Sequence, residues 1–224
     1  MLEIKLLWYS IFIYILSSSS FTLSCPPGYI GNGNNCTICP YGHYCPTSSQ
    51  AILCPKGTVN SWTFMDASDR VKCKECPLGY YNDKEGGIYN LYQSDCIRCP
   101  DGYYCPKIDE SPIICPKGTV NANGYYVSER VKCVECWLGS YNDKEGGIRN
   151  DSYSDCKTCP LGHYCPRIDQ PPILCPVNTI NSYGGSDRIK CDKCPIGWYN
   201  DKEGGIQNNW SGFSPGDCKY CNIC

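Results

Sequence analysis

Twenty-two cysteines recur along this chain in a pattern that repeats three times, and no other feature constrains the fold as strongly. Cys36 returns 60 residues later as Cys96 and after a further 60 residues as Cys156. Repeats of this length are typical of arrays in which each small module contacts mainly its neighbours. We therefore expect cross-links, rather than one large apolar core, to hold the chain together.

The composition favours an extracellular disulfide framework. Cysteine makes up about a tenth of the chain, the level at which disulfide scaffolds become the default for secreted sequences. The cysteine count is even, which suits complete pairing in an oxidising compartment. Only 4 phenylalanines and 2 methionines are present, so the apolar core is thin. A formal net charge of -2 provides no basic field for nucleic acid.

Residues 1–24 predict a cleaved secretory signal peptide. Lys5 precedes the apolar run from Leu6 to Leu16, and the small residues from Ser17 to Ser20 follow it. The alternative is an uncleaved membrane anchor, but the apolar run is shorter than the roughly 20 residues of a spanning helix. Every cysteine lies after this segment, which favours secretion and disulfide bonding.

The phrase Cys-Pro-x-Gly recurs through the units and predicts a turn. Proline at the second position and glycine at the fourth suit a type I turn, and the following Tyr or Thr begins a short strand. Trp137 replaces the proline after Cys136, and Asn178 replaces the glycine after Cys175. Asparagine tolerates unusual φ values, so we expect that turn to be kept. The phrase begins at Cys25, Cys39, Cys54, Cys76, Cys99, Cys115, Cys159 and Cys194.

Two further phrases recur once in each unit. Asp69–Cys73 reads Asp-Arg-Val-Lys-Cys, and its alternation predicts a short, solvated strand at a sheet edge. Asn82–Gly87 reads Asn-Asp-Lys-Glu-Gly-Gly and predicts a tight surface loop. Asp83, Glu85 and Asp95 form a candidate calcium cluster, although their spacing is not that of an EF-hand and a solvated loop explains them equally.

Two disulfide pairings are compatible with the cysteine spacing. One joins each turn cysteine to the next cysteine along the chain, and each such bridge stabilises by about 3 kcal/mol in the chain-entropy model. The other interlocks neighbours, as in Cys96–Cys105 with Cys99–Cys115. Spacing alone does not choose between them. The first scheme gives Cys54–Cys73, Cys76–Cys96, Cys115–Cys133, Cys136–Cys156, Cys175–Cys191 and Cys194–Cys218.

Zinc is the competing use of the Cys-x2-Cys doublets. Four thiolates with about 20 residues between the two doublets are typical of a zinc ribbon. The signal segment and the additional single cysteines favour disulfides instead. We therefore predict no cofactor and no metal. The candidate ribbon site consists of Cys73, Cys76, Cys96 and Cys99.

Catalysis is not expected. The chain has only two histidines, His43 and His163, and the second unit has Tyr103 at the equivalent position. Nucleophilic Cys–His chemistry needs an unpaired cysteine, which an even count does not readily leave. Three sequons, which begin at Asn35, Asn150 and Asn209, predict N-glycosylation on exposed loops. Asn35 is the weakest, because a cysteine occupies its middle position.

The phrases at Cys39, Cys54 and Cys76 (Cys-Pro-Tyr-Gly-His-Tyr-Cys-Pro, Cys-Pro-Lys-Gly-Thr-Val-Asn and Cys-Pro-Leu-Gly-Tyr-Tyr-Asn) resemble ephrin-receptor-like cysteine-rich repeats. These repeats are similar in style to tumour-necrosis-factor-receptor and EGF-like modules, and the resemblance covers residues 25–224. The resemblance implies extracellular, disulfide-laddered rods without catalysis of their own. The composition is also similar to that of cysteine-repeat surface antigens of protists.

We therefore predict a small disulfide-rich fold, an elongated tandem array of short β-hairpin and loop modules with little helix outside the signal segment. Every cysteine is assigned to a structural disulfide. The expected organisation is a signal peptide (1–24), a partial half-repeat (25–35), repeats 1 to 3 (36–95, 96–155 and 156–217) and the truncated start of a further repeat (218–224). The cysteines not named above are Cys45, Cys105, Cys159, Cys165, Cys221 and Cys224.

The expected function is that of a secreted or cell-surface, non-catalytic binding or spacer module with an extracellular protein or glycan partner. The alternatives are a membrane-attached surface antigen or receptor fragment, and a zinc-binding protein. Membrane association is expected only through residues 1–24 or a missing C-terminal region. Aromatic side chains are candidate contacts, although packing against disulfides is the favoured role for them. These aromatics are Tyr80, Tyr81, Tyr141, Trp198 and Tyr199.

Overall fold

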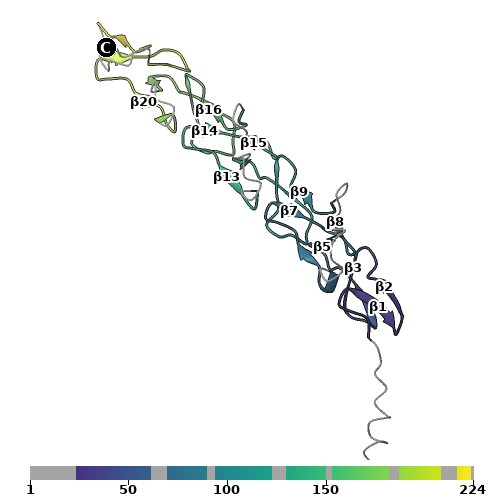
Figure 1. Cartoon of the computed structure of the whole chain (residues 1–224). Helices are drawn as coiled ribbons and strands as arrows, with labels where there is room; N and C mark the ends of the chain where they lie inside the picture. Colours follow the sequence, from purple (N-terminus) through teal and green to yellow (C-terminus); the bar gives the residue numbers. More distant parts are fainter. Residues whose placement is uncertain are drawn as a thin grey trace, which may run out of the picture. The chain divides into compact units, whose positions relative to one another are not determined.

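A computed structural model of the chain describes residues 24–61, 70–89, 94–122, 130–149, 153–181, 187–207 and 216–222. The described residues form short β-strands, joined by tight turns, and no α-helix (Figure 1). This confirms the predicted class, a tandem series of disulfide-rich hairpin modules. The predicted signal peptide lies outside the described residues except for Ser24.

The chain falls into two compact units, which do not follow the repeat boundaries. The first comprises Met1–Pro55, Val59–Lys74 and Glu85–Ser94, and the second comprises Lys56–Thr58, Glu75–Lys84 and Asp95–Cys224. The boundaries assigned from the sequence repeat thus remain a prediction. The same hairpin types occur in both units.

Each hairpin opens on a Cys-Pro-x-Gly turn whose frame differs by one residue from the predicted one. The amide of Tyr80 donates to the carbonyl of Pro77, 3.0 Å away, and Gly79 has a φ of 82°. Proline is therefore the first residue of the turn and glycine the third, the position of a type II turn that requires positive φ. The type I assignment was wrong, because the glycine supplies left-handed backbone inside the turn rather than its exit.

This frame explains both departures from the phrase. The first turn position contributes only a carbonyl, so Trp137 serves there as well as proline and accepts from the amide of Ser140 at 3.0 Å. Asn178 adopts a φ of 61°, as expected for asparagine in a glycine position, and its turn closes from Thr179 to Pro176. The expected survival of that turn is confirmed.

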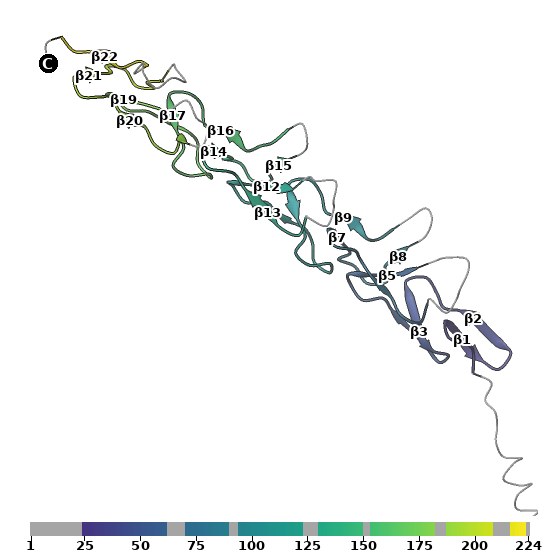
Figure 2. The same ribbon diagram turned by 60° about the vertical axis from the view of Figure 1, so that its left-hand side comes forward.

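Three kinds of antiparallel hairpin follow these turns and succeed one another along the chain (Figure 2). Those of the first two kinds lie within the predicted repeat limits, whereas each third-kind hairpin has its two strands on either side of a limit. The first kind comprises β3 (His43–Thr47) with β4 (Gln50–Leu53), β10 (Tyr103–Tyr104) with β11 (Ile113–Ile114), and β17 (His163–Tyr164) with β18 (Ile173–Leu174). The second kind comprises β5 (Thr58–Ser61) with β6 (Lys74–Glu75), β12 (Thr119–Ala122) with β13 (Cys133–Glu135), and β19 (Thr179–Ile180) with β20 (Asp192–Lys193). The third kind comprises β7 (Tyr80–Tyr81) with β9 (Ile97–Arg98), β14 (Ser140–Tyr141) with β16 (Lys157–Thr158), and β21 (Trp198–Tyr199) with β22 (Lys219–Tyr220).

The hairpin of β1 (Tyr29–Asn32) and β2 (Asn35–Ile38) spans the start of the first repeat and is also of the third kind. Two of the second-kind hairpins each have a third strand that pairs in parallel with the first strand of the hairpin. Hairpin signals in the sequence do not predict these parallel pairs. β8 (Ile88–Tyr89) pairs with β5, and β15 (Ile148–Arg149) pairs with β12. Both strands follow the Asn-Asp-Lys-Glu-Gly-Gly loop, which therefore returns the chain to the preceding hairpin.

Successive turns are connected by one recurring hydrogen bond. The amide of the cysteine that opens a turn donates to the carbonyl of the residue at the glycine position in an earlier turn, as from Cys99 to Gly79 at 2.9 Å. The bond from Cys194 to Asn178 has the same length. Each turn therefore satisfies the backbone of another, which compensates for the shortness of the strands.

The core consists mainly of half-cystines. Among the described residues, Val59, Val120 and Ile180 are the buried aliphatic side chains, and they occupy the same position in the three repeats. The asparagine that follows each of them is also buried. So little buried aliphatic surface contributes only a few kcal/mol per module, and the covalent bridges carry much of the stability.

Candidate functional site

Ten disulfides close the described hairpins, and the sequential pairing is the one that the structure contains. The interlocked alternative is wrong: Cys99 pairs with Cys105, and Cys96 pairs with Cys76. In the first-kind hairpins the bridge joins the turn cysteine to a cysteine in or just after the first strand, six residues on, as in Cys159–Cys165. Cys221 is also disulfide-bonded, and its partner lies outside the described residues.

The candidate zinc site is not formed. Cys73 is bonded to Cys54, Cys76 to Cys96, and Cys99 to Cys105. Zinc needs free thiolates, and these sulfurs are consumed in disulfides. Within the parts of the chain that the structure describes, all cysteines are paired.

The Asp-Arg-Val-Lys-Cys phrase is not a solvated strand, which corrects the sequence interpretation. Arg130 is only 1% exposed and donates to the carbonyl of Cys99 at 2.6 Å. Arg70 is likewise buried and donates to Cys39, whereas Arg188 is half-buried and donates to Cys159. Burial lowers the pKa of Arg70, which the nearby Tyr41 partly offsets. In each repeat the arginine thus holds the turn that opens the first-kind hairpin in place by a hydrogen bond to its backbone.

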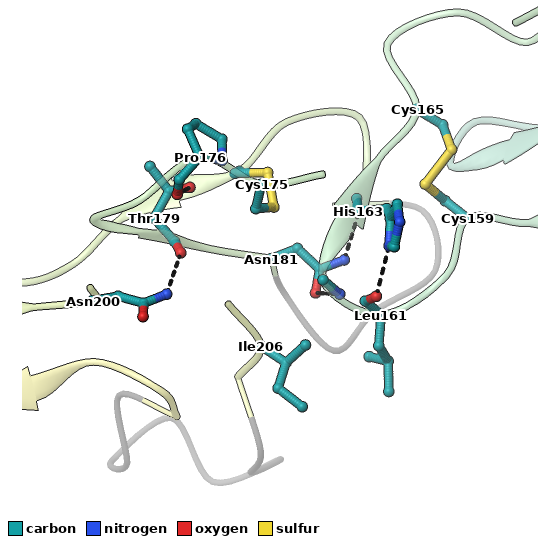
Figure 3. Close-up of a disulfide and its surroundings, with 12 residues drawn as sticks. Cys159, Leu161, His163, Cys165, Cys175, Pro176, Thr179, Asn181, Asn200 and Ile206 are labelled. Atoms are coloured by element: carbon teal, nitrogen blue, oxygen red, sulfur yellow. Dashed lines mark hydrogen bonds between the residues drawn. A yellow bond between two sulfur atoms is a disulfide. The ribbon is translucent and has the colours of Figure 1, made fainter. Parts of the chain in front are cut away.

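Two asparagines per repeat complete this polar framework (Figure 3). Asn181, which follows the buried Ile180, is fully buried and donates to the carbonyl of His163 at 2.7 Å. Asn200 opens the repeated loop and donates to the carbonyl of Thr179 at 3.2 Å. The loop was predicted to lie on the surface, but its first asparagine is buried in every repeat. Sequence reasoning missed these roles, since buried asparagine is rare.

The acidic residues of the loops act on the backbone. In the second repeat the carboxylate of Asp155 accepts from the amide of Ile148 at 2.8 Å and from the hydroxyl of Tyr153 at 2.6 Å. That hydrogen bond raises the pKa of Tyr153. Asp217 accepts in the same way from the amide of Ile206. Over the described ranges, no group of three or more His, Cys, Asp or Glu side chains is arranged to hold a metal ion.

The histidines and the first sequon have local roles. The rings of His43 and His163 donate from Nδ1 to the carbonyls of Tyr41 and Leu161, at 2.8 and 3.0 Å. Asn35 is exposed at the end of the β1–β2 hairpin, beside the bridged Cys36. Asn150 and Asn209 lie outside the described residues, so glycosylation remains a prediction at all three positions.

Most of the aromatic side chains that were candidate contacts are partly buried. Tyr80, Tyr81, Tyr141 and Trp198 are half-buried, and Tyr199 is exposed. The ring of Trp198 meets that of Tyr220 edge-on at 5.5 Å. Packing is therefore the main role of these side chains, as the sequence favoured.

The most exposed apolar side chains lie at the tips of the third-kind turns, which sequence analysis did not single out. Leu78, Leu138 and Ile196 occupy the second position of the turn in successive repeats. They are 64%, 67% and 103% exposed, respectively. The three turn tips, named so from here on, all belong to the second unit. No helix in the described part of the chain is long and apolar enough to cross a membrane.

Comparison with known proteins gives extracellular relatives that contain cysteine-rich repeats. Laminin subunit gamma-2 of Equus caballus is 24% identical over 227 residues, which cover 89% of this chain and 16% of that protein. Signal peptide, CUB and EGF-like domain-containing protein 2 of Mus musculus is 28% identical over 213 residues, 85% of this chain and 20% of that protein. Cysteine repeat modular protein B of Toxoplasma gondii is 26% identical over 189 residues, 78% of this chain and 2% of that protein.

The chain thus spans a fifth or less of these relatives. No family model matches it. The similarity does not single out the ephrin-receptor-like or tumour-necrosis-factor-receptor kinds of repeat. Together with the bridged hairpins, it shows a chain of cysteine-rich repeats similar to those of laminin and EGF-like extracellular proteins.

Proposed function

We propose that this chain is a non-catalytic array of extracellular modules that binds a protein partner through its three turn tips. The observation that carries the proposal is the exposure of Leu78, Leu138 and Ile196, each by more than 60%, at one repeated position. Contiguous exposed apolar patches mark interaction surfaces, whereas singly exposed residues are normal; the recurrence of an exposed aliphatic residue at one position of three repeats is what distinguishes these side chains from scattered ones.

Turn chemistry does not require these residues. The second position of such a turn accepts most residue types. It varies between repeats in the first-kind turns, which carry Tyr41, Asp101 and Leu161, and in the second-kind turns, which carry Lys56, Lys117 and Val177. An aliphatic residue in the third-kind turn of every repeat is therefore better explained by contact than by folding. This favours binding over a purely spacing role.

The finer assignment to ephrin-receptor-like repeats belongs to the same proposal. It is supported by the Cys-Pro-x-Gly phrases and by the three hairpins that follow them in each unit. The repeat limits 36–95, 96–155 and 156–217 are proposed as the modules. Each holds one first-kind hairpin, one second-kind hairpin and the first strand of a third-kind hairpin, whose second strand lies beyond the limit. Secretion through residues 1–24 would place these modules outside the cell, where disulfides persist.

The test compares two variants of the full chain, expressed with residues 1–24 in a eukaryotic secretory host. L78S/L138S/I196S removes the turn tips, and K56S/K117S changes exposed residues at the same turn position elsewhere. We expect both variants to be secreted, and crosslinking to matrix or cell-surface proteins to be lost only in the first. Retained crosslinking in L78S/L138S/I196S would reject the binding surface, and recovery of the unaltered chain in the membrane pellet would favour an anchored form.

A further inference from the structure

Neighbouring repeats contact each other through one recurring hydrogen bond. The amide of Asn82 donates to the carbonyl of Ile108 in the next repeat, and that of Asn142 donates to Ile168, both at 2.8 Å. Within the first unit, the equivalent amide of Gly31 donates to Ser48 at 2.7 Å. In each case, a loop of the following first-kind hairpin caps the end of the preceding third-kind strand.

A glycine makes room for this loop. A Cβ atom on Gly57 would lie 2.8 Å from Cγ1 of Ile108, and one on Gly118 would lie 2.9 Å from Cγ1 of Ile168. Both distances are shorter than real Cβ contacts, so a side chain at either glycine would force the isoleucine out of its present position. Ile168 packs against the buried cluster of Val120 and its neighbouring half-cystines. We call the glycine and the adjacent asparagine amide the module-docking surface.

The third repeat has an asparagine in place of this glycine. Asn178 keeps the backbone position, since its amide donates to the carbonyl of Asn200 at 2.7 Å, as Gly118 does to Asn142. Its side-chain Oδ1 accepts from the amide of Asn200 at 3.2 Å. That amide is the equivalent of the two that a following repeat caps.

We propose that Asn178 closes the module-docking surface of the third repeat and makes it the terminal module of the docked array. Its carboxamide supplies the hydrogen bond that a following loop would supply, and its Cβ occupies the space that an isoleucine would fill. Terminal repeats with a polar outer face are a general need of modular arrays. A further cysteine-rich module, placed after Cys218 or brought by a second copy, would find no open surface of this kind.

The rival explanation is that asparagine is present only because the turn needs positive φ. It predicts that exchanging Gly and Asn between repeats leaves docking unchanged. G118N separates the two explanations, because asparagine tolerates the φ of 79° at that position. G197N is its matched control: Gly197 has a φ of 81° in a turn of the same form, and an added Cβ there meets nothing within 4 Å.

The measurement is NMR on the full oxidised chain. For G118N we expect loss of the contacts between the methyl groups of Ile168 and Val120, and separate alignment of repeats 2 and 3 in residual dipolar couplings. G197N should retain both properties of the unaltered chain. Retained Ile168–Val120 contacts in G118N would overturn the proposal.

A second variant keeps the test decisive if G118N folds poorly. N178G restores the residue found in repeats 1 and 2 and suits positive φ. Because the Asn200 amide then loses its capping oxygen, its hydrogen exchange should accelerate by roughly tenfold or more. Unchanged exchange at Asn200 would show that Asn178 does not cap the surface.

Discussion

Repeats 2 and 3 have the same arginine bond in different settings. Arg130 is buried and forms an ion pair with Asp101 at 2.7 Å, whereas Arg188 is half-buried and the equivalent turn position holds Leu161. Both arginines donate to the carbonyl of the cysteine that opens the turn. The bond to the backbone is thus the constant element of the module, and the residue at the turn position adjusts how well it is shielded.

The first effect to test is the loss of each arginine. R130M leaves a buried carbonyl without its donor and should lower the free energy of local unfolding by about 3 kcal/mol. R188M acts at a half-buried site, and we expect about 1 kcal/mol. Native-state hydrogen exchange reads both, through the amides of Cys105 and Cys165, which donate to the carbonyls of these arginines. Equal losses in the two repeats would show that burial does not set the difference.

The second effect exchanges the turn residues. D101L removes the ion pair of repeat 2 and should cost about 1 kcal/mol, since one partner is buried and the other is largely exposed. L161D should make the stability of repeat 3 sensitive to salt. Melting curves at low and high ionic strength test both variants. If D101L leaves the salt dependence of repeat 2 unchanged, the ion pair does not distinguish the stability of repeat 2 from that of repeat 3.

The third effect extends the comparison to repeat 1. The guanidinium of Arg70 lies 5.4 Å from the ring centre of Tyr41, a cation–π contact. Y41L should lower stability by about 0.5 kcal/mol, while Y41F, which keeps the ring, should not. Thermal unfolding of the two variants is the measurement. Identical melting temperatures would show that the aromatic ring does not stabilise this site.

The smallest effect depends on pH. In repeat 3, Asp201 accepts from Lys219 at 3.1 Å, and this bond holds the pKa of Asp201 below its ordinary 3.8. A lowered pKa stabilises the fold above the unfolded-state value, and this contribution is lost as the pH falls through the folded-state value. An NMR titration should show the low pKa in the unaltered chain and a return toward 3.8 in K219M. An unchanged pKa in K219M would assign the shift to the backbone.

The cysteine spacing predicted the hairpin modules because cross-linked turns leave few other folds open to a chain with so little aliphatic core. The cysteine spacing did not determine the disulfide pairing, since the sequential and the interlocked schemes both join cysteines at similar separations. The predicted turns began one residue too early, because the sequence alone allowed proline at either the first or the second position of the turn. Arg130 was misplaced because alternation resembles a strand and arginine is seldom buried. The different roles of Gly118 and Asn178 depend on the next repeat, which no local pattern reveals.

The central claim is that each turn cysteine is bonded to the next cysteine along the chain, and disulfide mapping tests it most directly. The secreted protein should be alkylated without reductant, digested between its cysteines and analysed by mass spectrometry. We predict no alkylated thiols among the described cysteines and peptides linked through Cys76–Cys96, Cys99–Cys105 and Cys115–Cys133. Peptides linked through Cys96–Cys105 and Cys99–Cys115, or several free thiols with bound zinc, would contradict it.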